Sequence, residues 1–201
     1  MDFGAGTGRF AALLAATNPV VALDASREML EVARTKAAFS CVQGDGHRLP
    51  FIADAFDIAV VVMVLHQLAD PDRALADVAR VSHRVVIATT DMSSRRLGIL
   101  EEAFPSLLEI DRNRFPRIDT VAAALRSVGF REIHVEERPL RRTFTTEQQL
   151  DRVRRKYLST FDLLPPGEYE RGVRFLETEL PLRYGDRFET KASFTFLAAT
   201  R

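Results

Sequence analysis

The chain has 201 residues, 46% hydrophobic and 28% charged, and a chain of this size buries roughly 70% of its unfolded surface without a disulfide or a metal. Its 28 basic and 28 acidic residues give zero formal net charge, which argues against a nucleic-acid binder that works through bulk phosphate attraction. The only cysteine, Cys41, excludes an internal disulfide and a cysteine-rich metal site. We expect a single cytoplasmic domain, because we find no signal peptide and the longest apolar stretch, residues 58–65, is too short to span a bilayer.

The first two thirds of the chain alternate between helical and strand patterns. Ser26 is a good N-cap for one helix, and Pro71 suits the first position of another. In chain order we predict a helix at 9–17, a strand at 20–24, a helix at 27–37, strands at 39–43 and 56–65, a helix at 72–82 and a strand at 84–91. This rhythm indicates an α/β fold with a doubly wound, Rossmann-like, mostly parallel sheet covered by helices on both faces.

The last third is mainly helical. We predict helices at 97–104, 120–128, 146–161 and 168–180, a loop at 109–118, and strands at 130–137 and 191–200. Two segments, about 92–117 and 140–190, are expected to form helical caps over a ligand pocket. Tyr157, Phe161 and Tyr169 either line that pocket or belong to the core.

A glycine-rich loop stands at the start of the chain, where residues 2–8 read DFGAGTG. A phosphate-binding P-loop needs a lysine and a hydroxyl after its last glycine, and here Arg9 and Phe10 follow. Arg9 also occupies the place where a dinucleotide fingerprint needs its third glycine. The remaining pattern, DxGxGxG, is that of S-adenosylmethionine binding, with a glycine turn made for packing as the alternative.

Two acidic residues follow later strands and strengthen the cofactor hypothesis. Asp24 closes the second predicted strand, where a carboxylate can accept hydrogen bonds from both ribose hydroxyls. Asp45 comes just after the third strand, where it can meet an adenine amino group. The alternatives are a helix N-terminal aspartate for Asp24 and an ordinary Gly-Asp-Gly turn for Asp45. Ligands of such sheets bind at the carboxyl ends of the strands, so both residues are expected at one edge with the glycine loop.

Five stretches in order and spacing carry a family resemblance: MDFGAGTGRF, VVALDASREML, VQGDGHRLPF, FDIAVVVMVLHQLADPDRALADVARV and LRSVGF. They resemble the class I S-adenosylmethionine-dependent methyltransferases, within them the small-molecule type 11 group. The resemblance covers residues 1–90 and implies an antiparallel C-terminal strand. It also implies that most of the first strand and the helix before it are missing from this chain.

The resemblance assigns a cofactor site residue by residue. The glycines would line the methionine part of S-adenosylmethionine, Asp24 would hold the ribose, and Asp45 would contact the adenine edge. The implied cofactor-binding set is Asp2, Gly4, Gly6, Gly8, Asp24, Ala25, Met29, Asp45, Gly46 and Val62.

Few residues are candidates for the chemistry of methyl transfer, because an activated methyl group needs alignment more than acid–base help. His66 is the candidate base, with a tie between the strand end and the next loop as the alternative. Asp70 and Asp91 match no metal-ligand spacing, so no metal is expected. A cluster of arginines either binds an anionic acceptor or is solvated: Arg95, Arg96, Arg112 and Arg114.

Three functional hypotheses follow. The leading one is methyl transfer from S-adenosylmethionine to an oxygen or carbon of a small-molecule acceptor, with no nucleic acid or membrane partner. Formation of a homodimer is left open. The alternatives are a degenerate, non-catalytic binding or regulatory protein, and a nicotinamide oxidoreductase, against which Arg9 counts.

Overall fold

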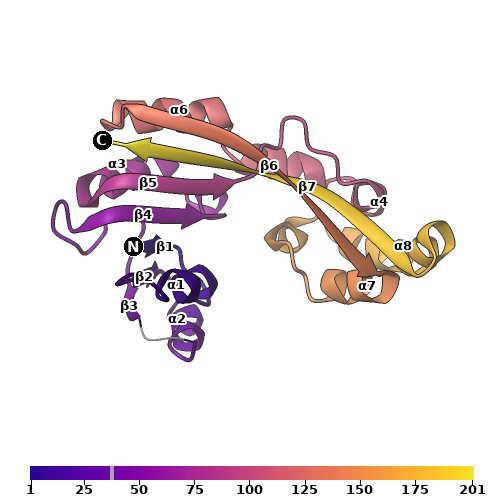
Figure 1. Cartoon of the computed structure of the whole chain (residues 1–201). Helices are drawn as coiled ribbons and strands as arrows, with labels where there is room; N and C mark the ends of the chain where they lie inside the picture. The colour runs from indigo at the N-terminus through magenta and orange to yellow at the C-terminus, as the bar shows by residue number, and fades with distance from the viewer. Residues whose placement is uncertain (37–38) are drawn as a thin grey trace. The chain divides into compact units, whose positions relative to one another are not determined.

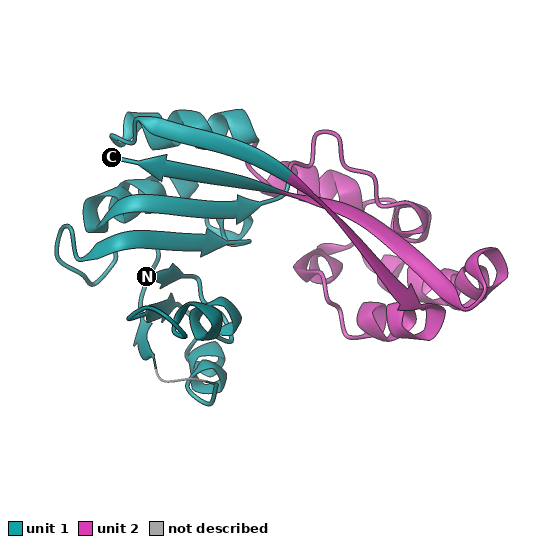
Figure 2. Ribbon diagram, viewed as in Figure 1, with its two compact units in different colours: residues 1–90, 118–137, 195–201 teal, residues 91–117, 138–194 magenta. Residues whose placement is uncertain are grey.

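The computed structural model describes residues 1–36 and 39–201, and the chain divides into two units (Figures 1 and 2). Unit 1 contains residues 1–90, 118–137 and 195–201, and unit 2 contains residues 91–117 and 138–194. Within the described ranges, no helix is long and apolar enough to cross a membrane.

The strands form one sheet in the order β3-β2-β1-β4-β5-β7-β6. Neighbours among the first five are parallel, and β7 runs antiparallel to β5. The strands are β1 (Asp2–Phe3), β2 (Val21–Asp24), β3 (Ser40–Gln43), β4 (Phe56–Val62), β5 (Ser82–Thr89), β6 (Glu132–Thr145) and β7 (Arg187–Thr200). The predicted mostly parallel sheet with an antiparallel C-terminal strand is therefore confirmed.

The helices of unit 1 cover both faces of this sheet. They are α1 (Arg9–Leu14), α2 (Arg27–Ala33), the 3-10 helix η1 (Leu65–Gln67), α3 (Pro71–Val81) and α6 (Ile118–Ser127). The strand order runs one way from β1 through β2 to β3 and the other way from β4 to β5. Right-handed crossovers then place α1 and α2 on the face opposite α3, and α6 contacts α3.

The core of unit 1 explains why these strands are so apolar. Phe3, Val61 and Ile87 are at most 2% exposed, and they belong to one cluster with Leu75 of α3 and Leu125 of α6. A central parallel strand is covered on both faces, so β4 reads as the nearly continuous apolar run FDIAVVV. The core therefore fixes the strands whose carboxyl ends carry the candidate site.

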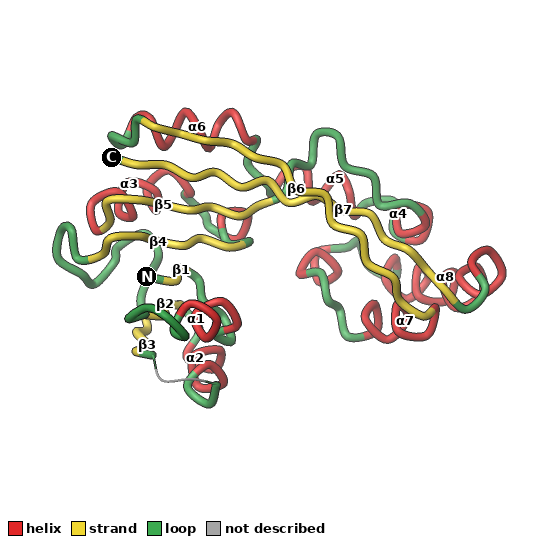
Figure 3. Tube along the Cα trace, viewed as in Figure 1, coloured by secondary structure: helices red, strands yellow, loops and turns green. Residues whose placement is uncertain are grey.

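Three predicted elements of unit 1 end at least three residues earlier than expected, and Figure 3 shows the helices and strands as they are. The strand predicted at 56–65 stops at Val62, because Met63 adopts a positive φ of 53°. The helix predicted at 9–17 ends at Leu14. The helix predicted at 27–37 ends at Ala33, and its last predicted position, residue 37, lies outside the described residues. The predicted caps of two helices are confirmed: Ser26 accepts from the Met29 amide, and Pro71 opens α3.

Unit 2 has its own apolar core. Its helices are α4 (Ile99–Ala103), α5 (Leu107–Arg114), α7 (Thr146–Arg154), the 3-10 helix η2 (Ser159–Leu163) and α8 (Glu168–Tyr184). Phe104, Phe161 and Leu176 are at most 2% exposed in one cluster, and the ring of Tyr169 lies 5.6 Å from that of Phe161. Phe161 and Tyr169 therefore belong to the core of unit 2, which was the second of their two predicted roles.

Two predictions for unit 2 are wrong. The segment 109–118 was predicted as a loop, but α5 occupies most of it. Its many charged residues conceal the helical spacing of the buried Leu107 and Asp111. The helix predicted at 146–161 ends at Arg154, because Lys156 adopts a positive φ of 49° and the chain continues into η2.

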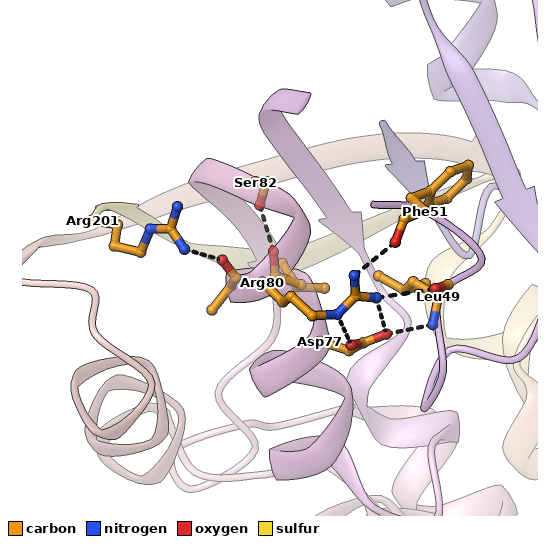
Figure 4. A network of polar contacts seen from close by, with 8 residues as sticks. Leu49, Phe51, Asp77, Arg80, Ser82 and Arg201 are labelled. Atoms are coloured by element: carbon orange, nitrogen blue, oxygen red, sulfur yellow. Dashed lines mark hydrogen bonds and ion pairs between the residues drawn. The ribbon is translucent and has the colours of Figure 1, made fainter. Parts of the chain in front are cut away.

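A polar network attaches the loop after β3 to helix α3 (Figure 4). The Arg80 guanidinium donates to both carboxylate oxygens of Asp77, at 2.6 and 3.0 Å, and to the carbonyls of Phe51 and Leu49, at 2.7 and 3.0 Å. Asp77 in turn accepts a hydrogen bond from the Leu49 amide. One guanidinium therefore holds both the carboxylate and the loop.

We predict that Arg80→Met lowers the free energy of unfolding by about 2 kcal/mol, because it removes these hydrogen bonds and leaves the Asp77 carboxylate without its cation. Urea denaturation is the measurement. The matched control is Arg84→Met on the exposed side of β5, which should change the value by less than about 0.5 kcal/mol. Equal effects of the two substitutions would show that the network does not hold the loop.

Candidate cofactor site

Most of the predicted cofactor residues lie at or just after the carboxyl ends of the parallel strands of unit 1, and Figures 1 and 3 show these strands. The glycine loop follows β1, Asp24 is the last residue of β2, and Val62 is the last of β4. Parallel pairing aligns these ends, since Phe3 lies opposite Leu23 and Val61. The predicted common edge is thus present, and it is the edge at which sheets of this topology bind ligands.

The three glycines of the loop differ in what surrounds them. All have positive φ, 68° at Gly4, 53° at Gly6 and 74° at Gly8. A Cβ at Gly4 would lie 2.4 Å from a methyl group of Val64, and one at Gly8 would lie 2.8 Å from Ala33. At Gly6 it would meet no atom within 4 Å. Gly4 and Gly8 are therefore required by packing, whereas Gly6 faces open space.

Asp24 connects the loop to the next helix. One carboxylate oxygen accepts from the Gly6 amide at 2.6 Å, and the other accepts from the Ser26 amide at 2.9 Å. Ser26, not Asp24, caps helix α2. A carboxylate has about four acceptor positions, so the half-buried Asp24 retains capacity for further donors.

Asp2 lies beneath the loop and is only 2% exposed. One of its carboxylate oxygens has no hydrogen-bond partner among the described residues. Burial raises the pKa of Asp2 to about 6, with the nearby Ala11 backbone and the chain's own ammonium acting in the opposite direction. A positively charged group placed above the loop would offset this cost of burial.

Asp45 is exposed and belongs to a short polar chain at the same edge. It accepts from the backbone amide of His47 at 2.9 Å and pairs with the Nδ1 atom of His47 at 2.8 Å, and these contacts lower the pKa of Asp45. The Nε2 atom of His47 accepts from the Asp70 amide at 3.3 Å. Gly46 packs against Phe3, since a Cβ there would lie 2.7 Å from its ring.

The other predicted residues differ in exposure. Ala25 and Met29 are exposed at the start of α2, and Val62 is half-buried. His66 lies in η1, directly after β4, and is 9% exposed. Sequence reasoning missed Met63, whose positive φ turns the chain away from β4. No motif signals that turn, because it depends on how the segment packs and not on a glycine.

The predicted arginine cluster is only partly assembled, and all of it belongs to unit 2. Arg96 is exposed and donates to the Arg95 carbonyl at 3.1 Å, and Arg112 donates to the Met92 carbonyl at 3.3 Å. The Nη1 atom of Arg114 lies 3.9 Å from a carboxylate oxygen of Asp111, and the charge of Asp111 also acts to raise the pKa of Arg95. Two of the four arginines thus donate hydrogen bonds to backbone carbonyls.

No site for a metal ion is found among the described residues, which contain no group of three or more His, Cys, Asp or Glu suited to hold one. Cys41 is half-buried on β3. A hollow of about 470 Å³ lies at the opposite edge of the sheet, lined by Val21, Ser40 and Phe56 at the starts of β2, β3 and β4. It is therefore separate from the glycine loop.

Comparisons with known proteins agree with this geometry. Residues 1–85 match the model of the type 11 methyltransferase domain family. The demethylmenaquinone methyltransferase of Clavibacter sepedonicus is 30% identical over 160 residues, which are 66% of this chain and 65% of that protein. The malonyl-[acyl-carrier protein] O-methyltransferase of Methylococcus capsulatus is 29% identical over 155 residues, 72% of this chain and 56% of that one.

A solved structure shares the fold. A putative methyltransferase from an antibiotic biosynthesis pathway of Anabaena variabilis superimposes with a TM-score of 0.76 at 22% identity, over 97% of this chain and 88% of that chain. Residues 1–85 are thus similar to the type 11 methyltransferase domain family, and the likeness to the solved structure shows a shared fold. The chain spans less than two thirds of the length of the two relatives named above.

We predict that alanine separates the glycines by their cost in stability. Gly6→Ala should lower the free energy of unfolding by about 1 kcal/mol, from the positive φ alone. Gly4→Ala should lower it by about 3 kcal/mol, because its Cβ also collides with Val64. Urea denaturation of both variants measures the difference. Equal losses would contradict the assignment of Gly4 to packing and of Gly6 to open space.

We predict a pH dependence of stability from Asp2. Its pKa is raised from 3.8 to about 6 in the folded chain, so the folded state holds the proton more tightly than the unfolded state between these values. The wild type should therefore lose up to about 3 kcal/mol relative to Asp2→Asn as the pH rises from 4 to 7, with no further loss above. Urea titrations at each pH give the difference. A pH-independent difference in stability between wild type and Asp2→Asn would show that the Asp2 carboxyl group is not buried as described.

Proposed function

We propose that the chain transfers a methyl group from S-adenosylmethionine to an oxygen or carbon of a small-molecule acceptor. The observation that carries the proposal is the open space at Gly6. The backbone amide of Gly6 donates a hydrogen bond of 2.6 Å to the Asp24 carboxylate, which holds the loop in this conformation. The name of the Methylococcus relative, an O-methyltransferase, supports an oxygen acceptor.

The residues at the edge fit the proposed cofactor. The loop around Gly6 leaves room for its methionine part, and the buried, unpartnered oxygen of Asp2 suits a cationic group. The acceptor positions left on Asp24 suit the ribose hydroxyls. Ala25, Met29, Asp45, Gly46 and Val62 would hold the adenine and the sulfonium side, as the family resemblance implies.

The chain's part in catalysis would be mainly positional. The cofactor, when bound, supplies a methyl group already activated on a sulfonium. Holding the acceptor in line with that group provides most of the rate. His66, directly after β4, is the residue that we propose as the base for an acceptor that arrives protonated, since imidazole accepts protons near neutral pH.

We predict that S-adenosylhomocysteine binds the wild type and that Gly6→Ala weakens this binding at least about tenfold, because the added methyl group enters the ligand space. Isothermal titration calorimetry is the measurement. Gly167→Ala is the matched control: its φ is 76°, it belongs to unit 2, and its Cβ would meet only the end of the Arg171 side chain. No heat with the wild type would refute the cofactor assignment.

An assay of methyl transfer distinguishes an enzyme from a protein that only binds the cofactor. A panel of small hydroxylated and carbon-acidic acceptors is incubated with methyl-labelled S-adenosylmethionine, and we expect label in at least one product. His66→Gln should lower kcat and leave the affinity for S-adenosylhomocysteine unchanged. Binding of the cofactor without transfer to any acceptor would favour the alternative, a non-catalytic binding or regulatory protein.

A further inference from the structure

One histidine at the edge of the sheet in unit 1 has hydrogen-bond partners on both of its ring nitrogens. His47 lies in the loop after β3, and only 22% of its side chain is exposed. Its Nδ1 atom is 2.8 Å from a carboxylate oxygen of Asp45, and its Nε2 atom is 3.3 Å from the backbone nitrogen of Asp70. A neutral imidazole has one donor and one acceptor nitrogen, so both nitrogens of His47 can be satisfied at once.

The two partners determine which nitrogen of His47 carries the proton. The backbone N–H of Asp70 can only donate, so Nε2 is the acceptor, and the ionised carboxylate of Asp45 can only accept, so Nδ1 is the donor. The carboxylates of Asp45 and Asp70 attract a charged ring. A second proton, however, would stand on Nε2 against the Asp70 N–H, at the positive end of α3 that Asp70 caps. The ring is therefore neutral, with its proton on Nδ1.

This ring holds the carboxylate of Asp45 in one orientation. The side chain of Asp45 is 65% exposed, and an exposed carboxylate otherwise moves among several rotamers. One of its oxygens, Oδ1, accepts from the backbone amide of His47 at 2.9 Å and also from the Nδ1–H group at 2.8 Å. The backbone hydrogen bond is that of an ordinary aspartate turn, so the imidazole supplies the additional constraint. The second oxygen, Oδ2, keeps its acceptor positions for another donor.

The imidazole is in turn anchored by a second loop. The Asp70 amide that donates to Nε2 stands directly before Pro71, where α3 begins. Gly46, between Asp45 and His47 in the chain, packs in the same region, because a Cβ there would lie 2.7 Å from the Phe3 ring and 3.5 Å from Leu68. The orientation of Asp45 therefore depends on the loops that follow β3 and β4 together.

Asp45 also lies beside the end of β2. The backbone amide of Gly44 donates to the Asp24 carbonyl at 3.1 Å, and the side-chain amide of Gln43 donates to the Ala25 carbonyl at 3.1 Å. Adjacent strands are separated by about 4.8 Å, so Asp24 and Asp45 end neighbouring strands at one edge. A base attached to a ribose at Asp24 can therefore extend towards the oriented Asp45 carboxylate.

We propose that His47 is a positioning residue for cofactor recognition, which holds the Asp45 carboxylate so that Oδ2 accepts a hydrogen bond from the exocyclic amino group of adenine. The role of His47 rests on the proposed function, since it requires an adenosine cofactor at this edge. Inosine carries an oxygen in place of that amino group. It would face Oδ2 with a second acceptor and bind more weakly.

The proton position is tested in the full chain without any cofactor. Nitrogen-15 NMR of the histidine side chains at pH 8 distinguishes protonated from unprotonated ring nitrogens, and the signals that vanish in His47→Asn belong to His47. We expect a protonated Nδ1 and an unprotonated Nε2. A proton on Nε2 would overturn the proposal, because His47 could then not donate to Asp45.

Recognition is tested by isothermal titration calorimetry with S-adenosylhomocysteine and S-inosylhomocysteine. The wild type should bind the adenosine ligand at least about tenfold more tightly, because the inosine ligand replaces a hydrogen bond to a charged acceptor by repulsion. His47→Ala should reduce this preference to less than about threefold, because Asp45 is no longer held. Weaker binding of both ligands with the preference retained would assign His47 to structural support and overturn the proposal.

Two further variants identify the contact that matters. His47→Asn should restore most of the preference, since its side-chain N–H group takes the place of the Nδ1–H group. His134→Ala, which removes an exposed histidine of β6, should retain the preference in full. Equal losses of preference in His47→Asn and His47→Ala would show that the donor to Asp45 is not responsible.

The two proposals fail in different ways. If the wild type binds neither ligand, the proposed cofactor is refuted, and the recognition of adenine with it. If the wild type binds both ligands equally, the cofactor assignment stands, and only the role of His47 and Asp45 is refuted.

Discussion

The hydrogen bond from the Gly6 amide to the Asp24 carboxylate, 2.6 Å long, determines the shape of the candidate site. It joins the loop after β1 to the end of β2, and the second carboxylate oxygen joins the same residue to the start of α2 through the Ser26 amide. A loop with three glycines at positive φ can adopt many backbone conformations in the unfolded chain. The charge-assisted hydrogen bond at its centre therefore selects one of these conformations. The open space at Gly6 exists because that conformation is held.

The sheet makes this bond possible. β1 has two residues, and both pair with β2 on one side and β4 on the other, which fixes the point where the loop begins. Phe3, 2% exposed, anchors that point in the core and also packs under Gly46 of the loop after β3. The apolar core and the polar edge are therefore not independent, because the same short strand positions both loops.

The sequence predicted the parts of this arrangement that depend on local patterns. Apolar runs indicated β2, β4 and β5, and the spacing of glycines with Asp24 indicated the cofactor edge. What it missed depends on tertiary packing. The positive φ of Met63 and Lys156 ends elements without a glycine. Helix α5 is concealed by its charged composition. The sequence alone does not show that Gly4 and Gly6 are glycines for different reasons, because the difference depends on the position of the Val64 side chain in the folded chain.

Each unit retains buried polar atoms that lower its own stability. In unit 1 they include a carboxylate oxygen of Asp2 and the hydroxyl of Thr89, and in unit 2 they include two donors of Arg95. Apolar side chains of similar size would remove these costs, and folded chains of this size have only about 5–15 kcal/mol to spare. In unit 1 the acceptor belongs to the residue two positions before the glycine loop, which suits the cation-bearing cofactor that we propose. Such groups persist where a ligand of opposite character completes them. On this argument the buried oxygen of Asp2 supports the cation-bearing cofactor that we propose for unit 1.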